Sequence, residues 1–148
     1  MIDLAVFFLL RVRGYVCCMV AVNLEDFNEL TRAIIGCAMT VHRKLGRGFP
    51  EVVYQRSLAI ELFKNGLNAE REVDLPVFYE NEKVGSRRAD FFVEKRVLVE
   101  LKAVDGLIEA HRVQLINYLE AFKIPVGLLI NFGSTSLQFK RLVKSPKS

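Results

Sequence analysis

Residues 88–104 read RADFFVEKRVLVELKAV and set three charged side chains, Asp90, Glu100 and Lys102, inside two apolar runs. Such runs predict buried strands, where an ionised group is costly unless it is paired or binds a metal. Alternate residues of a strand share a face, so Glu100 and Lys102 point the same way. If the chain reverses through residues 94–96, Asp90 lies directly across from Glu100 on that face. Like charges so placed repel unless a cation lies between them, so the stretch predicts a divalent-metal site with a lysine beside it.

The same three residues also allow a structural interpretation. In a surface-facing strand, Lys102 would form a cross-strand ion pair with Asp90, and the E-x-K spacing is common in strands. The largely apolar character of residues 97–104 favours burial and hence the metal site. The residues alone leave both interpretations open.

Hydrophobic spacing along the rest of the chain predicts the order ααβββαββ. We expect helices over residues 25–45, about 50–65 and about 107–122. We expect strands over residues 70–80, 84–93, 97–104, 126–132 and 137–143, with a turn at 81–83. This order predicts an α/β domain over residues 23–143, followed by a basic tail at 144–148.

Composition bounds the class of protein without fixing its function. The chain has 148 residues, 51% of them hydrophobic and 26% charged, which predicts one globular domain. Its net charge of +4 permits nucleic-acid binding without being diagnostic of it. The three cysteines, Cys17, Cys18 and Cys37, have neither zinc spacing nor an even count, so a reducing, cytoplasmic setting is expected.

The first 22 residues form an apolar extension that Asp3, Arg11 and Arg13 interrupt. The uninterrupted runs are too short to span a bilayer, and the segment lacks the marks of a secretory signal. One explanation is that the natural start is Met19 and that residues 1–18 are an upstream extension. A second explanation, that the segment anchors the protein at a membrane surface, is less favoured than an upstream extension. We therefore expect no membrane partner.

Other side chains could serve a site on the predicted sheet. Glu51 follows a glycine-rich turn and begins the second helix, where it could reach a metal or only favour the helix dipole. Tyr54 lies one turn further and is by default a packing residue. Several further candidates have ordinary structural alternatives: Gln114 and Tyr118 on one helical face, the phosphate-contact candidates Arg87, Arg88 and Arg112, and the lone histidines His42 and His111.

Taken together, these motifs resemble a known family. Residues 48–54, GFPEVVY, match the G-x-x-E-x-x-Y signature of the GxxExxY proteins. The flanking text agrees over VHRKLGRGFPEVVYQRSLAIEL, RADFFV, VELKAV, QLINYL and GLLINFG, in that order. The resemblance spans about residues 25–143 and places the chain near the PD-(D/E)xK, restriction-endonuclease-like superfamily, whose RecB-like branch carries a Q-x-x-x-Y motif. Arg47 stands where proline is expected, and the three cysteines are not placed for an iron–sulfur cluster.

The resemblance implies a mixed central sheet flanked by helices, with a site for Mg²⁺ or alternatively Mn²⁺. Asp90, Glu100 and the backbone carbonyl of Leu101 would be ligands, and Glu51 would complete or orient the site. Lys102 would polarise the attacking water or stabilise developing negative charge. The residues implied to contact nucleic acid are Gln114, Tyr118, Tyr54, Arg88 and Arg112.

The sequence therefore predicts a small Mg²⁺-dependent nuclease that hydrolyses the backbone of nucleic acid. One alternative is a module of the same fold that binds nucleic acid, or assembles with a partner, without cleaving. Another is a protein that cleaves only within a complex. DNA or RNA as substrate, and a protein partner or a homodimer, stay open at this point.

Overall fold

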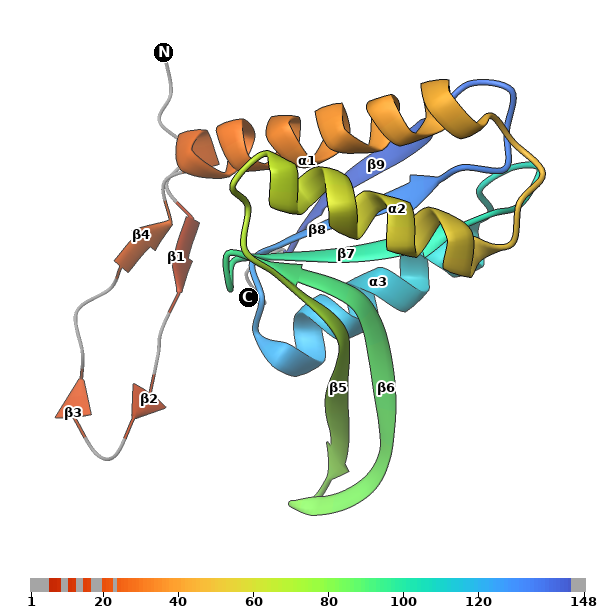
Figure 1. Ribbon diagram of the computed structural model, residues 1–148. Helices are drawn as coiled ribbons and strands as arrows, with labels where there is room; N and C mark the ends of the chain where they lie inside the picture. Colours follow the sequence, from red (N-terminus) through yellow and green to blue (C-terminus); the bar gives the residue numbers. More distant parts are fainter. Residues whose placement is uncertain (1–5, 9–10, 13–14, 17–19, 23, 145–148) are drawn as a thin grey trace.

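The computed structural model describes residues 6–8, 11–12, 15–16, 20–22 and 24–144, with side chains described from residue 25 onward. A five-stranded sheet of order β5-β6-β7-β8-β9 forms its centre (Figure 1). The strands are β5 Ala69–Tyr79, β6 Glu82–Val93, β7 Val97–Lys102, β8 Val126–Asn131 and β9 Gln138–Val143. The helices are α1 Leu24–Leu45, α2 Glu51–Lys64 and α3 Glu109–Phe122. The predicted α/β class and the order ααβββαββ are confirmed.

The sheet is mixed because one connection crosses over while the others reverse. β5–β6, β6–β7 and β8–β9 pair antiparallel, whereas β7–β8 pair parallel. Parallel neighbours need a long crossover, and α3 supplies it. The apolar run at residues 126–132 becomes the buried strand β8, as its composition predicts.

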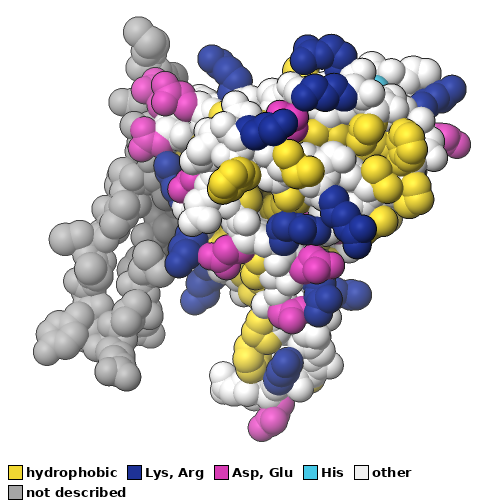
Figure 2. Space-filling model, in the orientation of Figure 1, with side chains coloured by type: hydrophobic (Ala, Val, Ile, Leu, Met, Phe, Trp, Pro, Cys, Tyr) yellow, Lys and Arg dark blue, Asp and Glu magenta, His cyan; other side chains and the backbone are white. Residues whose placement is uncertain are grey.

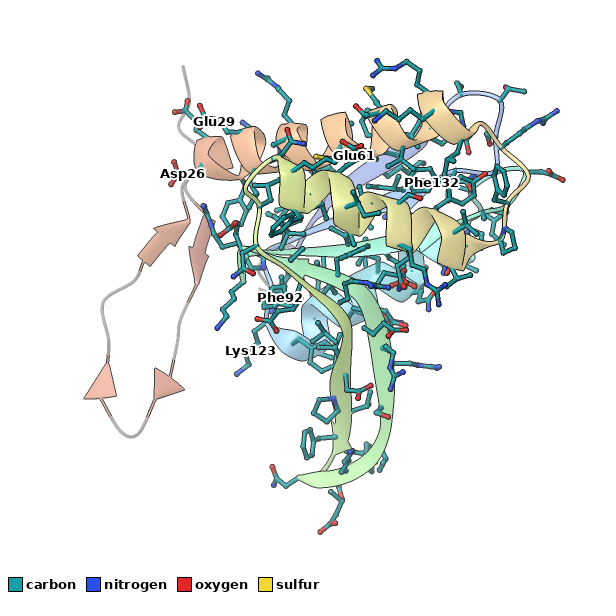
Figure 3. The ribbon with its side chains drawn as sticks, in the orientation of Figure 1. Asp26, Glu29, Glu61, Phe92, Lys123 and Phe132 are labelled. Carbon is teal, nitrogen blue, oxygen red and sulfur yellow. The ribbon has the colours of Figure 1, made fainter. Side chains whose placement is uncertain are left out.

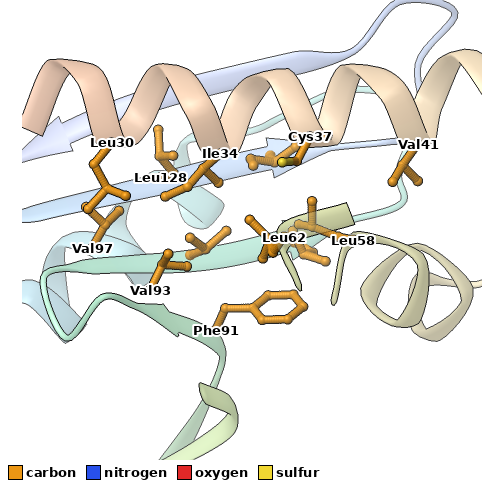
Figure 4. Packing of buried hydrophobic residues seen from close by; sticks show 14 of the residues in the cluster. Leu30, Ile34, Cys37, Val41, Leu58, Leu62, Phe91, Val93, Val97 and Leu128 are labelled. Carbon is orange, nitrogen blue, oxygen red and sulfur yellow. The ribbon is translucent and has the colours of Figure 1, made fainter. Parts of the chain in front are cut away.

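Two hydrophobic clusters lie on opposite faces of the sheet. On one face α1 and α2 cover β7 and β8, through contacts that include Ile34, Leu58, Leu62 and Phe91 (Figure 4). On the other face Leu98 of β7 packs with side chains of α3, such as Leu115 and Leu119. Burying one such side chain contributes roughly 1.5–3 kcal/mol, so both helical layers hold the central strands in place.

Two of the element boundaries that differ from the sequence prediction do so for identifiable reasons. β6 begins at Glu82 rather than 84, because Glu80 and Asn81 both take positive φ, of 45° and 69°, and make a tighter turn. β7 ends at Lys102 rather than 104. The Val104 N–H donates to Asn131 Oδ1 at 3.0 Å, and the Val104 carbonyl accepts from Asn131 Nδ2 at 2.8 Å. A buried side chain thus replaces the strand ladder at this point.

The β5–β6 hairpin extends well beyond the body of the protein as a curved arm (Figure 1). β6 pairs with β7 only between Phe91↔Val99 and Val93↔Val97, which leaves its outer part paired with β5 alone. Near the tip Phe78, Tyr79 and Val84 are exposed. Figure 2 shows hydrophobic, basic and acidic side chains mixed along this arm.

The N-terminal extension forms separate strand pairs where it is described. β1 Val6–Phe8 pairs with β4 Val20–Val22, and β2 Arg11–Val12 pairs with β3 Tyr15–Val16, both antiparallel. Neither pair joins the five-stranded sheet. The predicted start at Met19 and residues 145–148 of the basic tail lie outside the described residues. Among the described helices, none combines the length and apolar character needed to cross a membrane.

Gly133→Ala should destabilise the fold strongly, because a Cβ at this position would lie 2.2 Å from the Val104 carbonyl oxygen and 2.4 Å from its nitrogen. Both atoms belong to backbone that Asn131 holds in place, so neither can move aside at little cost. We expect a fall in melting temperature of roughly 5 °C or more. Gly85→Ala is the matched control, since a Cβ there meets no atom within 4 Å. Equal melting temperatures for the two variants would contradict the packing described.

Candidate active site

The candidate site lies where β6 separates from β7. The last paired residues are Phe91 and Val99, and continuing that register sets Asp90 opposite Glu100, as the hairpin argument predicts. Beyond Phe91 and Val99 a side chain replaces the backbone hydrogen bonds between the two strands, because the Leu101 N–H donates to Asp90 Oδ2 at 2.8 Å. Asp90 therefore replaces the backbone partner of β7 at the point where the arm begins.

Asp90 is also held from α2. Gln55 Nε2 donates to Asp90 Oδ1 at 2.8 Å, and Arg71 of β5 donates in turn to Gln55 Oε1 at 3.1 Å. Gln55 is only 7% exposed, so its amide is fixed by packing as well as by hydrogen bonds. Gln55 and Arg71 were not among the residues selected from the sequence. The available signal was weak: Gln55 is a polar residue on the same helical face as Leu58 and Leu62.

Glu100 is a buried carboxylate with half of its hydrogen-bonding capacity unmet. Lys102 Nζ donates to Glu100 Oε1 at 3.1 Å. The other oxygen, Oε2, is buried and has no hydrogen-bond partner among the described residues. The carboxylate is 5% exposed, and an unmet buried acceptor of this kind carries a desolvation cost. A cation at Oε2 would remove that cost, so this donor fits an oxygen-preferring metal.

The three carboxyl groups influence one another electrostatically. Burial, and then the charge of Asp90, raise the pKa of Glu100 to about 7 despite Lys102. Burial raises the pKa of Asp90, and the bonds from Leu101 and Gln55 oppose that rise. Burial and Asp90 likewise raise the pKa of Glu51, against the effect of Lys102. These groups form one electrostatic cluster in which Lys102 only partly compensates the carboxylates.

The lysine does not make the ion pair that the structural interpretation required. Lys102 pairs with Glu100, on the same strand and face, rather than with Asp90 across the hairpin. Among the described residues, no group of three or more His, Cys, Asp or Glu side chains is arranged to hold a metal by itself. An ion at this site would therefore need donors beyond such a cluster, such as a backbone carbonyl or water.

Tyr54 has a structural role that corrects its inclusion among the nucleic-acid contacts. Its ring is fully buried and stacks on Phe132, with centroids 4.7 Å apart. Phe132 is labelled in Figure 3. Its hydroxyl donates to the Gly46 carbonyl at 2.8 Å and accepts from the Phe49 N–H at 3.2 Å. A side chain without exposed surface cannot contact a strand, so Tyr54 instead fastens the turn that precedes Glu51.

The other predicted contacts lie on the arm and on α3. On α3, Gln114 Nε2 donates to the Tyr118 hydroxyl at 2.7 Å. Arg88 pairs with Asp74 on the arm at 2.9 Å, and Arg112 pairs with Glu109 on α3 at 2.5 Å. Both ion pairs are exposed and therefore weak, so either arginine could exchange its partner for a phosphate.

The two histidines make structural contacts. The ring of His42 hydrogen-bonds through Nε2 to the Ser134 carbonyl at 3.0 Å. His111 Nδ1 accepts the Ile108 N–H at 3.2 Å and so caps the start of α3. Both histidines thus hold local structure, as the structural alternative for each describes.

Comparisons with known proteins identify the family of this chain and a solved structure of similar fold. The family model described as "PD-(D/E)XK nuclease superfamily" matches residues 28–142. No curated protein matches the chain. A solved structure titled "Crystal structure of SSO0001" is similar in fold, with a TM-score of 0.54 and 20% sequence identity. The similarity covers 66% of this chain and 52% of that one, so this chain spans about half the length of the solved protein. The narrower GxxExxY assignment stays a prediction.

Glu100→Gln should stabilise the metal-free protein at pH 8. The pKa of Glu100 is about 7 in the fold against 4.5 as its ordinary value, so the folded state binds the proton more tightly than the unfolded chain. Its contribution to stability is therefore complete below about pH 4.5 and is lost as the pH rises through 7. Removing the charge should raise the free energy of unfolding by about 1–3 kcal/mol at pH 8, and the gain should vanish near pH 4.

Thermal melts in EDTA across this pH range measure the effect. Glu82→Gln is the matched control, because Glu82 is exposed at the turn of the arm. If Glu100→Gln lowers the melting temperature at pH 8, the carboxylate is satisfied in the folded state and the argument for an unmet charge is wrong.

Proposed function

Because the chain belongs to the PD-(D/E)XK nuclease superfamily, we propose that it is a metal-dependent nuclease that hydrolyses the phosphodiester backbone of nucleic acid. The observation that carries the proposal is the buried carboxylate of Glu100, whose Oε2 has no partner among the described residues while Lys102 holds Oε1. A purely structural Glu100–Lys102 ion pair would not require a second carboxylate beside it, that of Asp90, which among the described residues accepts hydrogen bonds only from the neutral groups of Leu101 and Gln55.

We assign the metal to donors around the separation of β6 and β7. Asp90 and Glu100 would supply carboxylate oxygens, the backbone carbonyl of Leu101 would supply a third donor, and Glu51 would complete or orient the site. All of these are oxygen donors, which suit Mg²⁺ and also admit Mn²⁺. When bound, the ion would supply positive charge that activates a water and stabilises charge on the phosphate oxygens.

Lys102 would be the principal catalytic residue that is not a ligand. Its ammonium group is largely buried and is held 3.1 Å from Glu100 Oε1, so its position is fixed before substrate arrives. A fixed charge in a poorly hydrated site stabilises developing negative charge more strongly than one in water. Lys102 would therefore polarise the attacking water or stabilise developing negative charge, as the family resemblance implies.

Gln55 would position Asp90 through the hydrogen bond to its Oδ1. That bond leaves further lone pairs on both carboxylate oxygens for an ion. Gln114, Tyr118, Arg88 and Arg112 are the remaining side chains that we propose for strand contacts. The two arginines would have to leave Asp74 and Glu109 to contact phosphates.

Lys102→Ala should abolish cleavage while the fold and metal binding persist. The substitution removes a charge and no ligand, and losing one such preorganised contact commonly costs about 10²–10³ in rate. The measurement is cleavage of single- and double-stranded DNA and RNA in Mg²⁺, Mn²⁺ or EDTA, together with thermal melts. Lys64→Ala is the matched control, because Lys64 is an exposed lysine on α2.

The outcome separates the proposal from its alternatives. Cleavage by Lys102→Ala at the wild-type rate would show that the mechanism is wrong. Binding without cleavage by wild-type protein would favour a catalytically silent binding module. Cleavage that appears only when a partner protein is added would favour a partner-dependent enzyme.

Gln55→Ala should weaken Asp90 as a ligand without touching the lysine. We expect cleavage to fall about 10–100-fold and the Mg²⁺ concentration for half-maximal rate to rise, because ligand-orienting side chains have effects of this size. Gln55→Met keeps most of the side-chain volume and should behave like Gln55→Ala if the hydrogen bond is what matters. If Gln55→Met retains the wild-type Mg²⁺ dependence, the role of Gln55 is packing alone.

A further inference from the structure

The arm and α3 enclose a groove of about 630 Å³ whose lining includes none of the proposed metal ligands. Val77 and Arg87 line it from the hairpin. The facing wall is one side of α3 and includes Val113, Asn117 and Phe122. We call it the arm groove, and we propose that it binds an unpaired segment of nucleic acid, an inference that rests on the proposed function and names its substrate class.

The charges of the arm groove suit a phosphate backbone. Arg87 is the charged residue among those that line it, and none of them is acidic. In the part of the chain that the structure describes, Arg87 makes no ion pair, whereas the adjacent Arg88 is neutralised by Asp74. A cation held without a counter-ion on the wall of a groove attracts an anion, and phosphate is the anion that the neighbouring carboxylate–lysine site would process.

The remaining lining favours bases that are not paired in a duplex. Val113 is 43% exposed on the wall of the groove, and Val77 and Phe122 add apolar surface. The amide groups of Gln114 and Asn117 stand among them. A duplex hides the faces and pairing edges of its bases and would offer this surface little besides sugar and phosphate. Unstacked bases offer apolar faces and pairing edges, which apolar side chains and amides recognise.

The arm groove is also placed to serve the carboxylates. Glu100 and Lys102 lie on the same face of β7 as Leu98, which packs against α3. Arg87 precedes Asp90 by three residues on β6, which corresponds to roughly 10 Å along a strand. Gln114 and Tyr118, bonded to each other at 2.7 Å, line the groove from α3. A strand whose phosphate contacts Arg87 would therefore lie within a few nucleotides of the proposed metal site.

Two variants test the arm groove by equilibrium binding of short fluorescent oligonucleotides, single-stranded and duplex, as DNA and as RNA. The protein carries Lys102→Ala in Mg²⁺, so that any cleavage is suppressed. Val113→Glu should weaken single-strand binding about tenfold or more and change duplex binding little. Arg87→Ala should lower the slope of log K against log salt for single strands by about 0.7, the value for one phosphate contact.

Matched controls lie on the opposite face of the sheet. Ile60→Glu places the same charge on an exposed apolar position of α2, and Arg32→Ala removes an exposed arginine of α1. Both controls should bind single strands like the parent, and melts should show all four variants folded.

The inference is overturned if Val113→Glu and Arg87→Ala bind single strands as the parent does. It is equally overturned if duplex binds as tightly as single strand and responds equally to Val113→Glu, or if no oligonucleotide binds. Failure of the proposed function gives a different result. In that case wild-type protein in Mg²⁺ leaves single strands intact, although they still bind in the arm groove.

Discussion

Two hydrogen bonds to the carboxylate of Asp90 hold together the candidate site and the base of the arm. One oxygen accepts the Leu101 N–H and the other accepts the amide of Gln55, so a single side chain joins β6, β7 and α2. Because it occupies the backbone donor that a neighbouring strand would otherwise use, β6 is released from the sheet and continues outward as the arm. The same bonds fix the carboxylate beside Glu100. The departure of the arm and the position of the candidate site therefore have one cause.

The desolvation cost of the buried Glu100 carboxylate is not offset by any hydrogen bond to its Oε2 among the described residues. Glu100 lies in a mostly apolar strand between Val99 and Leu101, where an apolar residue of similar size would avoid the desolvation of Oε2. Lys102 compensates one oxygen only, and the charge of Asp90 works against the ionised form. Local structure of this kind, unfavourable by itself and held by well-packed surroundings, is typical of functional sites. Binding of the proposed metal ion at Oε2 would therefore raise the stability of the protein.

Much of the fold followed from the sequence because it rests on local spacing. Apolar periodicity located the helices and strands, and strand alternation placed Glu100 and Lys102 on one face. What sequence could not supply were contacts between distant segments. Gln55 meets Asp90 across 35 residues, and Asn131 ends β7 across 27. The sequence around Gln55 or Asn131 does not predict which distant residue each one contacts. The arm was missed for a similar reason, since a hairpin's own pattern does not reveal how far its neighbour β7 accompanies it.

The contacts of Tyr54 explain the spacing of the G-x-x-E-x-x-Y segment. Tyr54 bonds the turn at Gly46 and Phe49 and stacks on Phe132. The Phe132 N–H in turn donates to the Lys102 carbonyl at 2.8 Å. The tyrosine thus ties the start of α2 to the strand that carries the lysine. Glu51 lies one helical turn before Tyr54, and Gln55 directly follows it, so fixing the tyrosine fixes both relative to Asp90. The spacing of the motif therefore has a structural reason. Tyr54 anchors α2 to the sheet, and the same helical turns place Glu51 and Gln55 near the carboxylate of Asp90.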